Sequence, residues 1–187
     1  MIEFLEYIDT RLFLFFNGHH TPFMDSVMGA ISYKYTWIPF YMILLFFVWK
    51  KAKSRMWIVV LSVAILITLS DQVSVHLFKE TFQRYRPSHN LLLQEQVQLI
   101  DGYRGGLYGF VSSHAANAFA LTTFLIFFFR RRDFALFMYL WASVVCYSRV
   151  YAGVHYPFDI LGGMMVGVFL GFIVYRFYFN FNKKYAE

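Results

Sequence analysis

A polar segment at residues 148–159 lies between two apolar runs that are long enough to cross much of a bilayer, and it carries Arg149, His155 and Asp159. Ionisable residues inside a membrane-embedded chain are rare and mark functional sites. Pro157 suits the first turn of a helix, so His155 would precede that helix and Asp159 would lie in its first turn. The carboxylate can then hold the imidazole, and the Arg can stabilise an anion. This set of side chains suits nucleophilic attack on an anionic centre such as phosphorus.

Two further segments carry polar residues at the ends of apolar runs. The segment 79–87 contains Lys79 and Arg86, and by itself it reads equally well as a basic cluster that snorkels at a helix end. Residues 112–114, Ser-Ser-His, precede another run. Their hydroxyls and backbone N–H groups suit either a simple N-cap or an anion site. Because a run end, a run start and a turn lie at the same depth, the three segments are predicted to meet on one membrane face.

The composition indicates an integral membrane protein. Hydrophobic residues make up 59% of the 187 residues and charged ones 15%, against about 45–50% and about 25% in soluble domains. The mean hydropathy is +0.48. The net charge of +6 suggests nucleic acid, but the basic residues lie between apolar runs, as in the positive loops of membrane proteins, so we expect no nucleic-acid partner. The single Cys146 cannot form an internal disulfide.

The elements that position these segments are predicted to form an all-α fold. We expect a polytopic transmembrane helical bundle of about five to six spans with an N-terminal interfacial amphipathic helix. Residues 2–16 place apolar side chains at helical spacing with charged ones on the opposite face, which favours a helix in the interface. Residues 21–33 form a second short apolar piece. The predicted spans are 35–50, 56–78, 113–129, 134–150 and 157–179.

Two points of topology stay open from the sequence. Lys34 can lie inside a longer first span over 26–49, and the N-terminal segment can provide a sixth crossing. In either case residues 1–187 are expected to form a single membrane domain. That domain would consist of an interfacial segment 1–33 and a transmembrane bundle 35–181.

Basic residues predict the orientation of the bundle. With five spans, the Lys and Arg residues of two loops and the C-terminus fall on one side: Lys50, Lys51, Lys53, Arg55, Arg130, Arg131, Arg132, Lys183 and Lys184. That side is predicted to be cytoplasmic. We therefore expect a protein of the cytoplasmic (inner) membrane whose active site faces the periplasm. Separately, Gly163, Gly167 and Gly171 at four-residue spacing predict the close approach of another helix.

The three polar segments resemble the three signatures of the type 2 phosphatidic acid phosphatase (PAP2) family. The first signature, Lys-x6-Arg-Pro, is present in full from Lys79, and the third, Ser-Arg-x5-His-x3-Asp, is present in full from Ser148. The middle signature, Pro-Ser-Gly-His, is altered, because residues 111–114 read Val-Ser-Ser-His. Ser113 in place of Gly keeps a backbone N–H donor but adds bulk near the phosphate. The site of this family is similar to that of the vanadium haloperoxidases.

The resemblance implies a phosphatase site without a metal or another cofactor. His155 would attack phosphorus and form a phosphohistidine, and Asp159 would fix the tautomer of His155. His114 would protonate the leaving group and then activate water. Cations, a hydroxyl and a backbone N–H would hold the phosphoryl oxygens: Lys79, Arg86, Arg149, Ser112 and Ser113. No carboxylate pair or His cluster suits a metal ion, so none is expected.

The leading hypothesis is a membrane lipid phosphatase. It implies a lipid phosphate substrate within the bilayer and no obligatory protein partner. The candidate substrates are lipid A, undecaprenyl pyrophosphate and glycerophospholipid phosphates. A transporter or channel is the alternative, because intramembrane charges also mark ion pathways; the lack of an inverted repeat and the charge at one face argue against it. The composition disfavours a haloperoxidase, since those enzymes are soluble. The role of Asp71 in the second span stays open.

Overall fold

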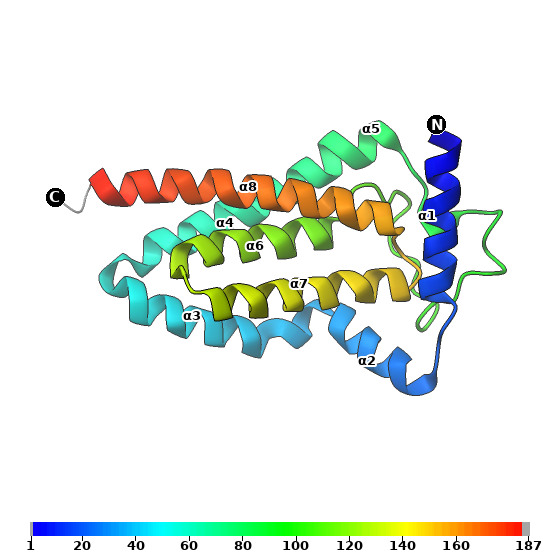
Figure 1. The fold of residues 1–187 in the computed structure, drawn as a ribbon, viewed down its shortest axis with the longest axis horizontal. Helices are drawn as coiled ribbons and strands as arrows, with labels where there is room; N and C mark the ends of the chain where they lie inside the picture. The colour runs from blue at the N-terminus through cyan, green and yellow to red at the C-terminus, as the bar shows by residue number, and fades with distance from the viewer. Residues whose placement is uncertain (1, 185–187) are drawn as a thin grey trace.

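The computed structural model describes residues 2–184, and within that range helices account for all regular structure apart from one isolated bridge. The helices are α1 (Ile2–Asn17), α2 (Pro22–Ser32), α3 (Ile38–Ala52), α4 (Met56–Gln72), α5 (Glu80–Phe82), α6 (Ser113–Phe129), α7 (Arg132–Tyr151) and α8 (Pro157–Lys184). A π-helical segment, Val73–Lys79, joins α4 to α5. Helices α3, α4, α6, α7 and α8 run along the long axis (Figure 1). The predicted all-α bundle is confirmed.

The predicted spans coincide with these helices. Three stretches are long and apolar enough to cross a membrane, namely Lys34–Phe82, Arg132–Tyr151 and Pro157–Lys183, and Ser113–Phe129 is a shorter apolar helix. The first stretch turns back on itself between α3 and α4, where Lys53 has a φ of 49°. It therefore provides two of the predicted spans. The longer first span over 26–49 is not formed, because α2 ends at Ser32 and extended Tyr33 separates it from α3.

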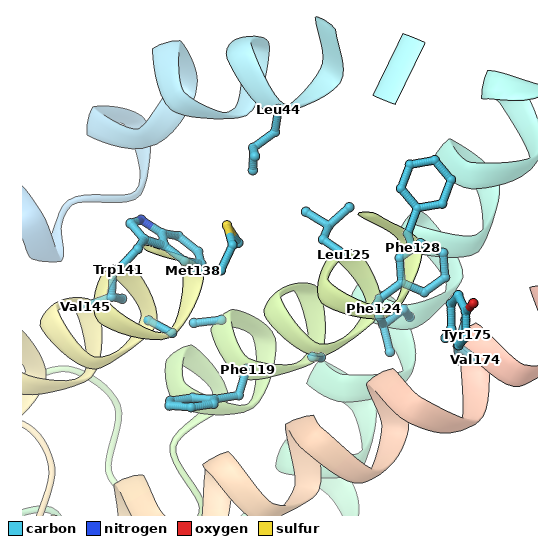
Figure 2. Close-up of a cluster of buried hydrophobic side chains, with 14 of the residues drawn as sticks. Leu44, Phe119, Phe124, Leu125, Phe128, Met138, Trp141, Val145, Val174 and Tyr175 are labelled. Carbon is cyan, nitrogen blue, oxygen red and sulfur yellow. The ribbon is translucent and has the colours of Figure 1, made fainter. Parts of the chain in front are cut away.

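Helix α6 lies at the centre of the hydrophobic core and packs against α4, α7 and α8. Figure 2 shows Phe119, Phe124 and Leu125 of α6 among side chains of the neighbouring helices, with Phe124 and Tyr175 ring centroids 6.0 Å apart. The glycine pattern predicted for close packing is confirmed. A Cβ atom on Gly167 would lie 2.3 Å from the carbonyl oxygen of Ala116, so only glycine lets the two backbones approach this closely.

Helix α1 lies across one end of the bundle rather than along it (Figure 1), as predicted for an interfacial helix. It ends at Asn17, and its crosswise position favours the interfacial arrangement over a sixth crossing. Its outward side exposes large apolar side chains such as Phe4 and Phe15. One part of the predicted pattern is wrong, because Asp9 does not share an exposed face with the other charged residues. Asp9 is fully buried against the bundle together with Phe13 and Asn17.

The basic loops gather at the opposite end of the bundle from α1. Lys51 at the end of α3 donates from Nζ to the carbonyl oxygen of Phe129, 3.1 Å away, at the end of α6. Arg55 at the start of α4 donates from Nη1 to Oδ1 of Asn182, 3.1 Å away, near the end of α8. These loops therefore lie together at one end of the bundle, as predicted. The three polar segments lie at the other end.

Candidate active site

The pair His155 and Asp159 lies where α8 begins. Pro157 is the first residue of α8, so His155 precedes the helix and Asp159 lies in its first turn, as predicted. His155 Nδ1 is 3.3 Å from Asp159 Oδ2, which also accepts the backbone N–H of Tyr156 at 3.0 Å. The two side chains are 1% and 0% exposed. The carboxylate favours a proton on Nδ1, so the lone pair of the imidazole lies on Nε2.

Arg84 and Arg86 contact this pair from a short extended segment. Residues 84–86 run antiparallel to residues 107–109, with hydrogen bonds from Arg86 N to Leu107 O (3.1 Å) and from Gly109 N to Arg84 O (2.8 Å). Alternate side chains of extended backbone point to the same face. Arg86 Nη1 lies 2.9 Å from His155 Nε2, and Arg84 Nη1 donates to Asp159 Oδ1 at 2.9 Å.

The electrostatic surroundings keep His155 neutral. Complete burial lowers the pKa of His155 well below 6.5, and the positive charges of Arg86, Arg149 and Lys79 lower it further. Burial also lowers the pKa of Arg86 to about 10, so this guanidinium stays charged at neutral pH. The site thus combines a neutral imidazole with fixed cations, which suits attack on a phosphate.

The end of the π-helical segment meets the start of α6. Lys79 donates from Nζ to Ser113 Oγ at 2.7 Å. Ser112 caps α6, where its Oγ accepts the N–H of Ala115 at 3.4 Å and its own N–H donates to the carbonyl oxygen of Asp159 at 3.0 Å. The hydroxyl proton of Ser112 stays available because the cap uses only the oxygen.

Arg149 reaches the site from the last turn of α7. It is 4% exposed, and its Nη1 donates to Ser32 Oγ on α2. Its Nε is buried and has no hydrogen-bond partner within residues 2–184. Buried donors are nearly always paired, so this Nε is a donor that the described protein atoms leave available.

His114 lines two adjoining cavities and is exposed to them. It lies close enough to Arg149, His155, Arg86 and Lys79 to interact with each electrostatically. The structure therefore brings together every residue that the sequence nominated for the site: Lys79, Arg86, Ser112, Ser113, His114, Arg149, His155 and Asp159.

The two cavities differ in character. The more apolar one, about 600 Å³, lies among α3, α4, α6 and α7 and is lined mainly by aliphatic and aromatic side chains, with Asp71 and Asn117 among its polar residues. The second, about 650 Å³, has a mixed lining that includes the polar residues Asp101, Tyr103 and Arg149. Ser32, Lys34 and His114 line both. An apolar chamber thus leads to the cations of the site.

Three residues that contact the site are not among the predicted catalytic and phosphate-binding residues, although Arg84 was a candidate for the headgroup pocket. Arg84 lies two residues before Arg86, a spacing that indicates a shared face once an extended conformation is assumed. Asp9, Phe13 and Asn17 recur every fourth residue and mark a buried stripe on α1, but the pattern does not identify the partner of Asp9. Gly109 permits close approach, since a Cβ there would lie 2.8 Å from Asp159 Oδ2. Within residues 2–184 no three His, Cys, Asp or Glu side chains are grouped to hold a metal ion.

Comparison with known proteins gives consistent matches. The model of the PAP2 superfamily matches residues 55–183. A lipid A 4'-phosphatase of Bacteroides thetaiotaomicron is 42% identical over 100% of this chain and 83% of its own length. A lipid A 4'-phosphatase of Porphyromonas gingivalis is 36% identical over 98% of this chain and 78% of its own length.

Two crystal structures share the fold. Aquifex aeolicus LpxE superposes with a TM-score of 0.66 at 23% identity and covers 89% of this chain and 94% of its own. A transmembrane PAP2 type phosphatidylglycerolphosphate phosphatase from Bacillus subtilis superposes with a TM-score of 0.72 at 22% identity, over 92% of this chain and 85% of its own.

Proposed function

This chain belongs to the PAP2 superfamily and is a membrane lipid phosphatase, and we propose that it removes a phosphate group from lipid A through a phosphohistidine on His155. The observation that carries the mechanism is the buried pair of His155 and Asp159, with Nε2 directed at the cations of the site. The similarity to two lipid A 4'-phosphatases supports the substrate. The matches to phosphatases favour this function over transport.

In the first step, Nε2 of His155 attacks phosphorus and the bond from phosphorus to the leaving oxygen breaks. Arg86 Nη1, which contacts Nε2 in the structure, would turn to a phosphoryl oxygen. Arg149 Nε, Lys79 and the Ser112 hydroxyl supply further donors, so charge that develops on the oxygens meets preorganised partners. His114 gives its proton to the leaving alkoxide.

In the second step, His114 takes a proton from water as the water oxygen attacks the phosphorus of the phosphohistidine. The bond from phosphorus to Nε2 breaks, inorganic phosphate forms and His155 returns to its neutral state. Asp159 holds Nδ1–H throughout and stabilises the positive charge on the imidazole while the phosphoryl group is attached.

The adjoining cavities support an amphiphilic substrate. An acyl chain would occupy the apolar chamber among α3, α4, α6 and α7, and the headgroup would lie in the polar chamber beside Arg149. Ligand sites of this size are mostly apolar, with a few placed polar groups that fix orientation. Because His114 borders both chambers, the scissile phosphate would sit between tail and headgroup sites.

The positive-inside rule supports an orientation with the α3–α4 turn and the α6–α7 turn in the cytoplasm. The active site would then face the periplasm from the cytoplasmic membrane. We also propose that residues 1–187 act as one membrane domain, with the segment 1–33 at the interface and the bundle over 35–181. The packing of α1 against the site end of the bundle supports this arrangement.

A phosphate-release assay on purified protein tests the function. Lipid A, undecaprenyl pyrophosphate and phosphatidylglycerophosphate are compared with and without EDTA, and His155→Ala serves as the inactive reference. We expect the highest kcat/KM for lipid A, no loss under EDTA and no release by His155→Ala. Preference for another lipid would overturn the substrate, and activity in His155→Ala would overturn the nucleophile.

A further inference from the structure

Arg84 lies between two buried carboxylates. Its Nη1 donates to Asp159 Oδ1 at 2.9 Å and its Nη2 donates to Asp9 Oδ2 at 2.8 Å. Both carboxylates are 0% exposed, whereas the Arg84 side chain is 24% exposed. The guanidinium also lies 4.2 Å from the ring centroid of Tyr156. A planar guanidinium fixed at three sides has little freedom to rotate, so Arg84 is a rigid link between α1 and the start of α8.

This link fixes the carboxylate of Asp159. With Oδ1 bound to Arg84, Oδ2 is left facing His155 Nδ1 and the N–H of Tyr156. Arg86 contacts the other end of the pair at His155 Nε2. The two arginines of one extended segment therefore hold the pair at both ends, and only Arg86 is placed to reach a phosphate.

Asp9 completes the arrangement from the interfacial helix. Its Oδ1 accepts the N–H of Phe158 at 2.9 Å, and its Oδ2 binds Arg84. Burial raises the pKa of Asp9, and hydrogen bonds from Arg84 and from the backbone N–H of Phe158 oppose that rise. The attraction within a buried ion pair offsets the cost of desolvation only when further hydrogen bonds satisfy the remaining atoms, and each oxygen of Asp9 has such a partner.

We propose that Arg84 and Asp9 are positioning residues that set the orientation and charge of Asp159. The packing of α1 against the bundle would thereby fix the carboxylate that orients the nucleophile His155. The inference rests on the proposed role of His155 as nucleophile. Neither residue would touch the substrate. Their replacement should therefore lower kcat and leave KM nearly unchanged.

The test measures kcat and KM for phosphate release from lipid A by single variants. Arg84→Gln should lower kcat about 10²-fold, the cost of a small displacement of a catalytic group, with KM within about 3-fold of wild type. Arg84→Lys keeps the charge and should recover part of the loss. Asp9→Asn keeps an acceptor for Phe158 N–H and should lower kcat about 10-fold. Glu3→Gln and Arg11→Gln, exposed on α1, are the matched controls and should match wild type.

A double-mutant cycle separates positioning from general destabilisation. If Arg84 acts through Asp159, the kcat of the double variant Arg84→Gln/Asp159→Asn should be less than about 3-fold below that of Asp159→Asn alone. The effects of two coupled residues are not additive. The proposal would be overturned if the loss of kcat in the double variant equalled the product of the two single losses, or if Arg84→Gln changed KM alone. Wild-type kcat in both Arg84→Gln and Asp9→Asn would also overturn it. His155→Ala is measured in parallel: activity there contradicts the nucleophile itself, whereas an inactive His155→Ala beside a fully active Arg84→Gln contradicts only the positioning role.

Discussion

At the scale of single residues, the proposed reaction depends on two properties of His155, namely its neutral charge and the orientation of its ring. Burial and three nearby cations oppose its protonation, while Asp159 holds Nδ1 and leaves the lone pair on Nε2. The same cations that keep the imidazole neutral are those that can bind phosphate. In the proposed mechanism, one cluster of positive charge thus keeps the nucleophile neutral and attracts the phosphate of the substrate.

His155→Ala should abolish phosphate release, with kcat reduced about 10³-fold or more, because no other described side chain occupies the position of Nε2. Asp159→Asn should reduce kcat about 10²-fold, since an amide cannot stabilise the imidazolium that carries the phosphoryl group. Rapid acid-free quench with radiolabelled lipid would detect phosphohistidine in wild type. Labelled phosphoprotein in His155→Ala would contradict the assignment.

The pH dependence of phosphohistidine formation follows from the same residue. In the proposed mechanism the neutral form of His155 is the nucleophile, and the pKa of His155 is lowered below 6.5, chiefly by burial and then by Arg86, Arg149 and Lys79. The rate should therefore hold as pH falls through 6.5 and decline only at lower pH. Rapid-quench rates across pH provide the measurement. In Arg86→Gln one cation is lost, so the decline should begin at higher pH; a shift to lower pH would contradict this account.

At the scale of elements, the loop of residues 83–112 positions the arginines, and glycines allow it to approach α8. A Cβ on Gly109 would lie 2.8 Å from Asp159 Oδ2 and 3.2 Å from Arg86 Cγ, whereas one on Gly106 would meet nothing within 4 Å. Gly109→Ala should therefore lower kcat about 10²-fold through displacement of the pair. Gly106→Ala is the matched control and should stay near wild type. Equal activity in the two variants would show that the loop yields without affecting the site.

The packing of α6 on α8 gives a second prediction for elements. Gly167→Ala gains about 1 kcal/mol of helix propensity, but its Cβ would lie 2.3 Å from the carbonyl oxygen of Ala116. Such overpacking costs about 1–3 kcal/mol, so the helices should separate and the melting temperature in detergent should fall. Met165→Ala on the exposed side of α8 is the control. A higher melting temperature for Gly167→Ala would mean that propensity outweighs the clash.

The elements were predictable because hydrophobic runs of about the right length determine spans, and because Pro157 and Ser112 mark helix starts. The meeting of the three segments at one end of the bundle was predictable, because each lies at the end of an apolar run; the roles of their residues follow from the family resemblance and stay predictions. The partners of Asp9 were not, since a contact from residue 9 to residues 84 and 158 depends on how α1 lies across the bundle. The extended pairing of residues 84–86 with 107–109 likewise depends on tertiary contacts.

For the whole molecule, charge is divided between the two ends of the bundle. The end with the turns after α3 and α6 carries more Lys and Arg than Asp and Glu, and the end with α1 carries the site. By the positive-inside rule, this division supports the proposed orientation in the membrane. In that orientation the tail of the proposed lipid substrate would enter the apolar chamber from the bilayer, and its phosphate would stay near water.

The orientation is open to a direct test by cysteine labelling. Leu92, 87% exposed at the site end, and Lys53, exposed in the turn between α3 and α4, are each changed to Cys in a Cys146→Ser background. A membrane-impermeant thiol reagent is applied to right-side-out membrane vesicles. Leu92→Cys should react at once, whereas Lys53→Cys should react only after permeabilisation. The reverse order would place the site in the cytoplasm, because a charged reagent reaches only the face to which it is added.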